Sequence, residues 1–582
     1  MAKDQNPLLS DDRPFSEHSS EERHIEEEDA LLTGEQRPQP ATHGWASWRE
    51  IGLFVWAIIA TILVVSLAAI YQNQQTSKHD RTGGWGDDGK PTGKRNLIFM
   101  VSDGMGPTSL SLSRSFRQTQ SGLPIDDVLT LDPHLIGSSR TRSTSSLITD
   151  SAAGATAFSC GLKSYNGAIS VLPDHSPCGT VMEAAKRAGY TTGLVVTTRI
   201  TDATPACFAA HVNKRSEEDL IALQEVGEHP LGKVVDLILG GGRCHFLPNT
   251  AAGSCRSDTT DVVAKAQSNG FTYVSNRSSF DALNSGNSVS LPLLGLFAET
   301  DIPYEIDRAQ QNDIYPSLSE MAQTALTALS AATRDSDKGF FLMIEGSRID
   351  HAGHGNDPVA QVHEVIEYDK AFSAVVSFLD KDTIEGALVG TSDHETGGLA
   401  TARQLHDAYP EYHWFPDLLV NATHSAENLA AQLDEHVSTH VAASEDAVKT
   451  WIRAQLIEVG LGIHDATDAE ISRLVNKDDP WPPSYVFADM ISRRAQVGWS
   501  THGHSAVDVN IYASKPQHAR RLIGNHENTE IGVFMREYLG VEVEGITDEL
   551  KGYTGEGWMG AGVKDGEDPV GVDQYHGDFR RH

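Results

Sequence analysis

Four apolar segments of the chain each lead to an acidic residue, and these residues are candidate metal ligands. They are Asp103, Asp202, Glu345 and Asp393. Open α/β sheets place their active sites at the carboxyl ends of the strands, so carboxylates that follow several strands converge at one edge. A single carboxylate after a strand is common and says little. The repetition of the pattern indicates a metal centre.

Further side chains with ligand chemistry lie close to these carboxylates in the sequence. If the chain is helical after Gly346, Asp350 and His354 lie four residues apart on one helix face, where they can bind one cation. Thr204 adds a hydroxyl two residues after Asp202, in a loop suited to Mg²⁺. The remaining candidate ligands are His394, beside Asp393, and either His502 or His504. This inventory supplies two zinc-like sites and one magnesium-like site, as in a phosphoryl-transfer centre.

The candidate nucleophile and the candidate phosphate ligand are Ser151 and Arg215. A helix that begins at Ser151 and continues through small residues leaves the hydroxyl uncrowded and backbone N–H groups available to an anion. A serine at such a position is more commonly an N-cap. The guanidinium of Arg215 offers two parallel donors to phosphate oxygens. Its place in the charged segment 214–219 nevertheless favours a solvated arginine.

Apolar strands must position these residues. Residues 340–344 have no polar face, which is typical of a strand buried on both sides of a parallel sheet. Further strands are expected at 96–102, 191–198, 234–239 and 385–392, and helical periodicity runs over 316–332. We predict an α/β fold with a large, mostly parallel central sheet flanked by helices on both faces. Residues 398–500, a mixed helical pattern with aromatic loops, are predicted to form an inserted cap.

The N-terminal part of the chain predicts a membrane anchor. Residues 51–71 carry no charge and match a hydrocarbon core of about 30 Å, so we predict one transmembrane helix. Residues 1–50 are acidic and poor in large apolar residues, which predicts a disordered cytosolic tail. Its acidic dileucine strings, Leu8-Leu9 and Leu31-Leu32, resemble signals that bind sorting adaptors.

The glycosylation sequons at Asn276 and Asn421 favour a lumenal location for everything after the membrane segment, in a single-pass type II arrangement. The basic flanks of the segment are nearly balanced and do not settle its orientation. Residues 72–95 are predicted to be a linker, residues 96–540 a catalytic domain, and residues 541–582 a flexible tail.

Composition excludes some classes of protein. The formal net charge of −34 argues against nucleic acid as a partner, because a phosphate backbone requires a basic surface. One membrane helix cannot form a substrate path by itself, which disfavours a transporter. Five cysteines do not make a disulfide framework in 582 residues, and at least one is unpaired within the chain. Cys244 and Cys255 bracket a loop and could pair in an oxidising compartment.

The motifs VSDGMG, TDSAAGATA, TDATPA, EGSRIDHAGH, TSDHETGG and HSAVDV occur in this order over residues 96–540. In this they resemble the alkaline phosphatase family, and most closely its membrane-anchored vacuolar type in fungi. The resemblance implies hydrolysis of small phosphomonoesters with broad specificity, possible action on phosphoproteins or phosphopeptides, a homodimer and a vacuolar membrane location. Sulfatases of the same superfold need a Cys/Ser-x-Pro-x-Arg pattern, which the sequence lacks.

The resemblance also assigns roles to residues. It makes Ser151 the nucleophile, phosphorylated during turnover, and Arg215 the phosphate ligand. It implies two zinc ions and one magnesium ion per chain. One zinc falls to Asp350, His354 and His504, the other to Asp103, Asp393 and His394, and magnesium to Asp103, Asp202, Thr204 and Glu345. His504 is preferred to His502 because the residues Val507-Asp508-Val509 that follow fit the family pattern.

Overall fold

The computed structural model describes residues 51–53, 55–67, 93–442, 444–555 and 557–560. The chain divides into two units, residues 1–78 and 79–582. Within the first unit, residues 51–53 and 55–67 are helical. The rest of the predicted membrane segment, the tail 1–50 and residues 72–92 of the linker lie outside the described residues. Over the part of the chain that is described, we found no helix with both the length and the apolar character needed to cross a membrane.

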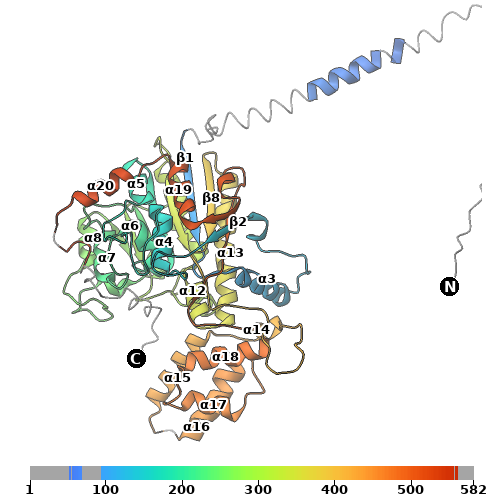
Figure 1. The fold of residues 1–582 in the computed structure, drawn as a ribbon, viewed down its shortest axis with the longest axis vertical. Coiled ribbons are helices and arrows are strands. Elements are labelled where there is room, and N and C mark those ends of the chain that lie inside the picture. The colour runs from blue at the N-terminus through green and yellow to red at the C-terminus, as the bar shows by residue number, and fades with distance from the viewer. Residues whose placement is uncertain (1–50, 54, 68–92, 443, 556, 561–582) are drawn as a thin grey trace, which may run out of the picture. The chain divides into compact units, whose positions relative to one another are not determined.

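A ten-stranded sheet forms the centre of the second unit (Figure 1), in the order β12-β2-β11-β8-β1-β7-β3-β4-β6-β5. All neighbours are parallel except β11, which runs antiparallel to β8 and β2. The predicted mostly parallel sheet is therefore confirmed. Its strands are β1 (Arg95–Val101), β2 (Leu135–Arg140), β3 (Thr191–Arg199), β4 (Leu237–Gly241), β5 (Thr272–Val274), β6 (Leu293–Leu296), β7 (Phe340–Glu345), β8 (Glu385–Thr391), β11 (Val509–Ala513) and β12 (Gly524–Glu527).

Helices cover both faces of this sheet, because successive residues of a buried strand point to opposite sides. In β1, Phe99 packs into one apolar cluster and Met100 into the other. The helices of the second unit outside the cap are α3 (Pro107–Ser121), α4 (Ser151–Cys160), α5 (Val181–Arg187), α6 (Ala203–Ala209), α7 (Glu218–Glu225), α8 (Val262–Ser268), α9 (Arg277–Asp281), α10 (Glu305–Arg308), α11 (Leu318–Ala332), α12 (Arg348–His354), α13 (Pro358–Lys381), α19 (Asn528–Leu539) and α20 (Glu544–Gly552).

The register of the central strands brings their carboxyl ends level. Val101, the last residue of β1, lies opposite Glu345 on one side and Thr391 on the other. Asp103 follows two residues after β1, and Asp393 two residues after β8. The parallel pairing therefore delivers carboxylates from three adjacent strands to one edge.

The region predicted to be a cap, residues 398–500, is helical, and its Leu429, Leu456 and Phe487 belong to an apolar cluster that also includes Phe116 of α3 and Val362 of α13. Its helices lie together at one end of the second unit (Figure 1). A two-stranded antiparallel sheet of β9 (Glu395–Thr396) and β10 (His504–Ser505) closes its base. The cap helices are α14 (Pro416–Val420), α15 (Ala426–Thr439), α16 (Glu445–Trp451), a π-helix (Ile452–Gly460), α17 (Asp468–Val475) and α18 (Pro483–Ala495).

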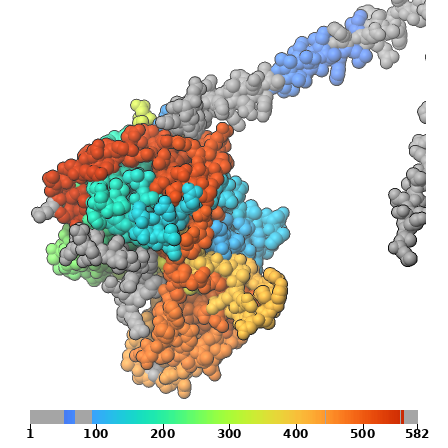
Figure 2. All heavy atoms as spheres, in the orientation of Figure 1, coloured from blue at the N-terminus to red at the C-terminus, as the bar shows by residue number. Residues whose placement is uncertain are grey.

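Residues 541–560 differ from the predicted flexible tail. They include α20, whose Ile546 and Leu550 are buried in the core. The Gly179 N–H donates a hydrogen bond to Thr547 Oγ1 at 2.8 Å. In Figure 2 this C-terminal segment runs across the surface beside earlier parts of the chain. The acidic, glycine-rich composition of this segment suggested a flexible tail, although Ile546 and Leu550 form an apolar face on α20. Residues 561–582 of the predicted tail lie outside the described residues.

Two disulfides link cysteines of the second unit. Cys244 pairs with Cys255, as the sequence allowed. Cys160 pairs with Cys178, a pair that sequence reasoning missed. Cys207 is buried and forms no disulfide.

Candidate active site

The predicted site residues meet at the carboxyl edge of the sheet. Glu345 ends β7, Asp350 and His354 follow on α12, and Asp202 and Thr204 begin α6 beyond β3. One cavity at this edge is lined by Asp103, Ser151, Asp202, Thr204, Arg215, Glu345 and Asp350. These side chains therefore converge at one edge of the sheet, as predicted.

Ser151 is placed at the start of α4 without capping it. Asp150 is the N-cap residue, and its Oδ1 accepts a hydrogen bond from the Ala153 N–H at 2.9 Å. The Ser151 hydroxyl is consequently not used by the helix, and its Oγ lies 3.1 Å from His394 Nε2. Gly154 allows the close approach of Asp393, since a Cβ there would lie 3.0 Å from the Asp393 Cβ. The small residues of this segment thus let the helix pack against the metal-type ligands.

Asp103, Asp393 and His394 form one buried group whose ligand atoms all lie within 4.8 Å of one another. The loop after β8 allows the adjacent Asp393 and His394 side chains to reach the same point, as predicted. Asp103 Oδ1 and Asp393 Oδ2 are buried without a hydrogen-bond partner. Burial and the neighbouring carboxylates of Asp393 and Asp350 hold the pKa of Asp103 well above its ordinary value. A bound cation would relieve this crowding of negative charge.

A second buried group brings Asp350 and His504 together with His394, and His354 borders it. His354 Nε2 lies 3.3 Å from Asp350 Oδ2 and 3.1 Å from His504 Nε2. His504 Nδ1 donates to the Thr149 carbonyl at 2.8 Å, and His354 Nδ1 donates to the His502 carbonyl. With Nδ1 protonated, each neutral imidazole presents its Nε2 lone pair to the same point as the Asp350 carboxylate. Histidines that bind metals are commonly held in this way, so the arrangement fits a divalent cation.

The structure separates the two candidate histidines. His504 Nε2 lies 3.6 Å from Asp350 Oδ1, inside the ligand group. The His502 ring instead donates from Nδ1 to the His354 carbonyl at 2.7 Å and stacks on Tyr485. Of the two, His504 has the geometry of a ligand.

Oxygen-rich side chains line the other side of the cavity. Thr204 Oγ1 is buried without a hydrogen-bond partner. Burial raises the pKa of Glu345 to about 8, and its Oε2 accepts a hydrogen bond from Ser347 Oγ at 2.5 Å. Although burial opposes ionisation, the Arg199 and Arg215 guanidiniums hold the pKa of Asp202 below its ordinary value. These carboxyl and hydroxyl oxygens are the ligand type that a hard cation prefers.

Arg215 lies in this cavity, so the expectation of a solvated arginine is wrong. Its side chain is only 6% exposed. It donates hydrogen bonds to Asp202 Oδ1 at 2.8 Å and Asp150 Oδ2 at 3.4 Å. The guanidinium is therefore held beside Ser151, where an anion would meet both.

Two residues that support the site were missed. Thr396 Oγ1 donates to Asp350 Oδ1 at 2.5 Å, and Arg199 binds Asp202 at 3.2 Å. Arg199 is the last residue of β3. A search for polar residues at the carboxyl ends of strands, which identified the carboxylates, could also have identified Arg199. Thr396 lies two residues after His394 and carries no such signal.

A second cluster of ionisable side chains lies away from the cavity. Glu183 Oε1 lies 2.8 Å from His211 Nε2 and 3.5 Å from His229 Nε2. His211 Nδ1 donates to the Ser170 carbonyl, whereas His229 Nδ1 accepts from the Leu231 N–H. Although burial opposes it, Glu183 raises the pKa of His211 above its ordinary value. Burial lowers the pKa of His229 to about 4. The cluster places one carboxylate beside two buried imidazoles whose pKa values are shifted in opposite directions.

Comparison with known proteins agrees with this geometry. The family model described as alkaline phosphatase matches residues 94–541. The chain is 55% identical over 475 residues to the repressible alkaline phosphatase of Saccharomyces cerevisiae, covering 79% of this chain and 83% of that protein. It is 46% identical over 534 residues to the alkaline phosphatase of Schizosaccharomyces pombe, covering 90% and 94%.

A solved structure shares the fold. The crystal structure of Thermus thermophilus alkaline phosphatase matches with a TM-score of 0.65 at 29% identity, covering 78% of this chain and 95% of that one. The family match extends over the whole sheet and every strand end that carries a candidate ligand. The chain therefore belongs to the alkaline phosphatase family of phosphomonoester hydrolases.

Proposed function

We propose that this enzyme hydrolyses phosphate monoesters with broad specificity through a phosphoserine at Ser151, releasing an alcohol and inorganic phosphate. The observation that carries the proposal is the placement of the Ser151 hydroxyl. Asp150 caps the helix in its place, His394 Nε2 lies 3.1 Å from its oxygen, and Arg215 lines the same cavity. A buried serine hydroxyl that faces ligand-type side chains and a guanidinium is suited to attack a phosphoryl group.

We assign two zinc ions and one magnesium ion to the site. Zinc would be held by Asp350, His354 and His504, and by Asp103, Asp393 and His394. Magnesium would be held by Asp103, Asp202, Thr204 and Glu345. The unpartnered oxygens of Asp103, Thr204 and Asp393 and the converging imidazole nitrogens support this assignment. When bound, such ions lower the pKa of a coordinated hydroxyl and offset the charge of phosphoryl oxygens.

The chain's own residues account for the rest of the reaction. Ser151, after loss of its proton, forms a bond to phosphorus while the bond to the leaving oxygen breaks, and that oxygen takes up a proton and departs as the alcohol. Arg215, held by Asp150 and Asp202, donates to the phosphoryl oxygens. Water then cleaves the phosphoserine and restores the Ser151 hydroxyl. Because these contacts go to the phosphoryl group and not to the alcohol, many monoesters should be accepted.

The test is phosphate release by the purified, metal-supplemented full chain across a panel of small monoesters, phosphopeptides and phosphoproteins. Acid quenching should trap one phosphate on Ser151. Ser151→Ala should abolish trapping and lower kcat by more than about a thousandfold. A Ser151→Ala variant that keeps its activity, or a strict preference for one monoester at saturating metal, would contradict the proposal.

We further propose a vacuolar location, with residues 51–71 as a single-pass type II anchor and the catalytic unit in the lumen as a homodimer. The two disulfides support an oxidising lumen, because such bonds are rare in the cytosol. Asn276 and Asn421 are exposed, as glycosylation requires. Protease protection of sealed vacuoles, glycosidase digestion and the mass in solution test these points. Adaptor binding to the dileucine strings is tested with a peptide of residues 1–50.

A further inference from the structure

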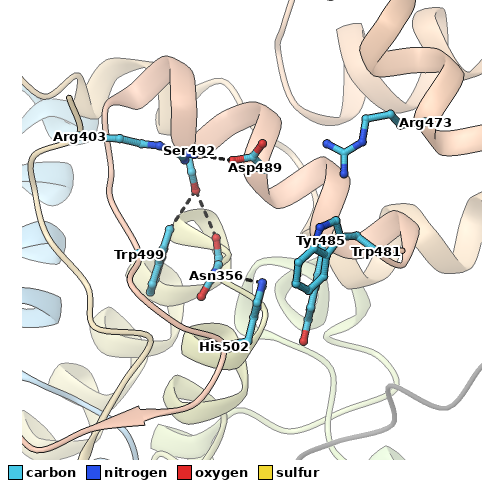
Figure 3. Close-up of a pocket in the computed structure, with 9 residues that line it drawn as sticks. All are labelled: Asn356, Arg403, Arg473, Trp481, Tyr485, Asp489, Ser492, Trp499 and His502. Carbon is cyan, nitrogen blue, oxygen red and sulfur yellow. Dashed lines mark hydrogen bonds and ion pairs between the residues drawn. The ribbon is translucent and has the colours of Figure 1, made fainter. Parts of the chain in front are cut away.

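A cavity of about 240 Å³ lies between the cap and residues beside it, and part of its wall is formed by the aromatic side chains of Trp481, Tyr485, Trp499 and His502 (Figure 3). We propose that this cavity binds the base of nucleoside monophosphates, as a leaving-group subsite of the active site. The proposal rests on the proposed phosphomonoesterase function and narrows it to a preferred class of substrate. The residues that carry the argument are His354, Trp481, Tyr485, Asp489 and His502.

The wall provides a surface for a planar ring. The Tyr485 and His502 rings stack with centroids 3.8 Å apart and an interplanar angle of 3°. Trp481 lies against both, with centroids 5.2 Å from His502 and 5.7 Å from Tyr485. Trp481 is 47% exposed. Ordered aromatic rings with one exposed indole are a common means of binding a nucleobase by stacking.

Polar groups border this wall. Arg403 and Asp489 form an ion pair at 2.9 Å, and both face the cavity (Figure 3). The side chain of Asn356 contacts His502 Nε2 at 3.4 Å. Carboxylate, guanidinium and amide groups offer acceptors and donors to the edge of a base. These groups already have partners within the protein, and a base could add to those contacts at its polar edge.

The cavity adjoins the ligand group directly. His502 Nδ1 donates to the His354 carbonyl at 2.7 Å, and His354 Nδ1 donates to the His502 carbonyl. His354 and His504 belong to one of the two groups proposed above to hold zinc. The aromatic wall and the ligands are therefore held together by reciprocal hydrogen bonds.

The order of contacts indicates how far the ring lies from the phosphate. Ser151 Oγ contacts His394, the His394 ring stacks on His504, and His504 Nε2 lies 3.1 Å from His354. His502 contacts His354 and is therefore one contact further from Ser151. From this chain of contacts we expect a ring bonded directly to the phosphate oxygen to remain beside the ligands and short of His502. A sugar between phosphate and ring supplies the spacer, which favours nucleotides over aryl phosphates.

The experiment compares esters that differ only in the base. For the wild-type full chain we expect kcat/KM to be higher for adenosine 5′-monophosphate than for ribose 5-phosphate. Trp481→Ala should lower the ratio of the two values about tenfold, as expected for the loss of one stacked base. The matched control is Trp451→Ala, which alters a cap tryptophan stacked on His436 and outside the cavity, and should leave the ratio unchanged. Thermal melting of both variants verifies folding.

Three outcomes would overturn the proposal: an unchanged ratio in Trp481→Ala, no wild-type preference for the nucleotide, or an equal loss of phenyl phosphate hydrolysis in that variant. A measurement that needs no catalysis separates the subsite from the proposed function. Adenosine itself, titrated calorimetrically, should bind wild type at least about tenfold more tightly than Trp481→Ala. Loss of all hydrolysis with adenosine binding retained would refute only the proposed function, whereas equal adenosine binding by the two proteins would refute the subsite.

Discussion

Arg215 donates a hydrogen bond to Asp202 Oδ1 at 2.8 Å, and the same oxygen accepts the Ala203 N–H at 2.7 Å. Asp202 is the N-cap of α6, so the start of that helix holds the Asp202 carboxylate in place. The carboxylate in turn holds the Arg215 guanidinium. Arg199 holds the other Asp202 oxygen at 3.2 Å. The position of Arg215, the proposed phosphate ligand, is consequently set by backbone geometry as well as by charge.

The Arg215→Lys variant should retain the fold but lose catalysis. A lysine ammonium is a compact charge that cannot offer two parallel donors while bound to Asp150 and Asp202. We expect kcat/KM to fall about a hundredfold and inorganic phosphate to inhibit more weakly. Arg453→Lys, at a surface ion pair with Asp468, is the control and should behave like wild type. Unchanged inhibition by phosphate in Arg215→Lys would show that Arg215 does not contact the anion.

A second prediction concerns Gly104, which follows Asp103 with φ of +74°. A Cβ at Gly104 would lie 2.6 Å from the Asp350 Cα. Gly104→Ala should therefore displace Asp350, lowering zinc content and phosphatase activity more than about tenfold. Gly122→Ala is the matched control, because Gly122 has φ of +60° and no atom within 4 Å of the added Cβ. It should cost about 1 kcal/mol of stability and leave activity intact. Similar activities for the two variants would rule out the steric argument.

The two histidines near the end of the cap should differ in metal retention. His504→Ala removes an imidazole whose nitrogen faces Asp350 and His354, so we expect zinc content to fall by about one ion per chain. His502→Ala should keep the zinc content of wild type, since the His502 ring faces the cap. Elemental analysis of the dialysed proteins is the measurement. Loss of zinc in His502→Ala alone would reverse the assignment.

The buried histidine His229 should make stability depend on pH below neutrality. Its pKa in the folded state is about 4, below the ordinary value of 6.5. Between these values the unfolded chain binds more protons, so stability falls as pH falls from 6.5 towards 4. His229→Asn can still accept the Leu231 N–H but does not titrate, so its melting temperature should fall less steeply over this range. Both proteins are compared with metals chelated, and parallel pH profiles would contradict the prediction.

The C-terminal helix α20 should contribute to stability. Ile546 is buried against Gly179 and the core, so Ile546→Ala should cost about 2–4 kcal/mol in the free energy of unfolding. Gly545→Ala is the control, because a Cβ there meets no atom within 4 Å and alanine favours a helix. It should be neutral or stabilising in urea titrations. Equal stability of the two variants would mean that α20 is not docked.

Local patterns in the sequence predicted the buried strands and the carboxylates at their carboxyl ends. Residues 340–344 of β7 are all apolar, and this run predicted a strand of a parallel sheet. Asp103, Glu345 and Asp393 were found because position relative to a strand end is visible in the sequence. The convergence of these residues required only that the strands be parallel neighbours, which the pairing of β1 with β7 and β8 provides.

Features that depend on distant partners could not be predicted in this way. Arg215 is buried because Asp150 and Asp202 flank it, and its charged neighbours in the sequence gave the opposite impression. Local spacing left the choice between His502 and His504 open, and only the family resemblance favoured His504. In the structure, the pairing of His504 with Thr396 across β10 and β9 places it. Cys160 lies at the end of a helix and Cys178 in a loop, with no sequence feature to join them.

The chain leaves the candidate metal ligands after Thr396 and returns to them at His504. The antiparallel pairing of β9 with β10 joins these two points. The cap therefore departs from and rejoins the rest of the unit at this one pair of strands. Evolution can therefore remodel this loop to suit new molecules while the reaction centre stays the same. A protein engineer could use the same junction to graft a foreign recognition module onto an unaltered catalyst.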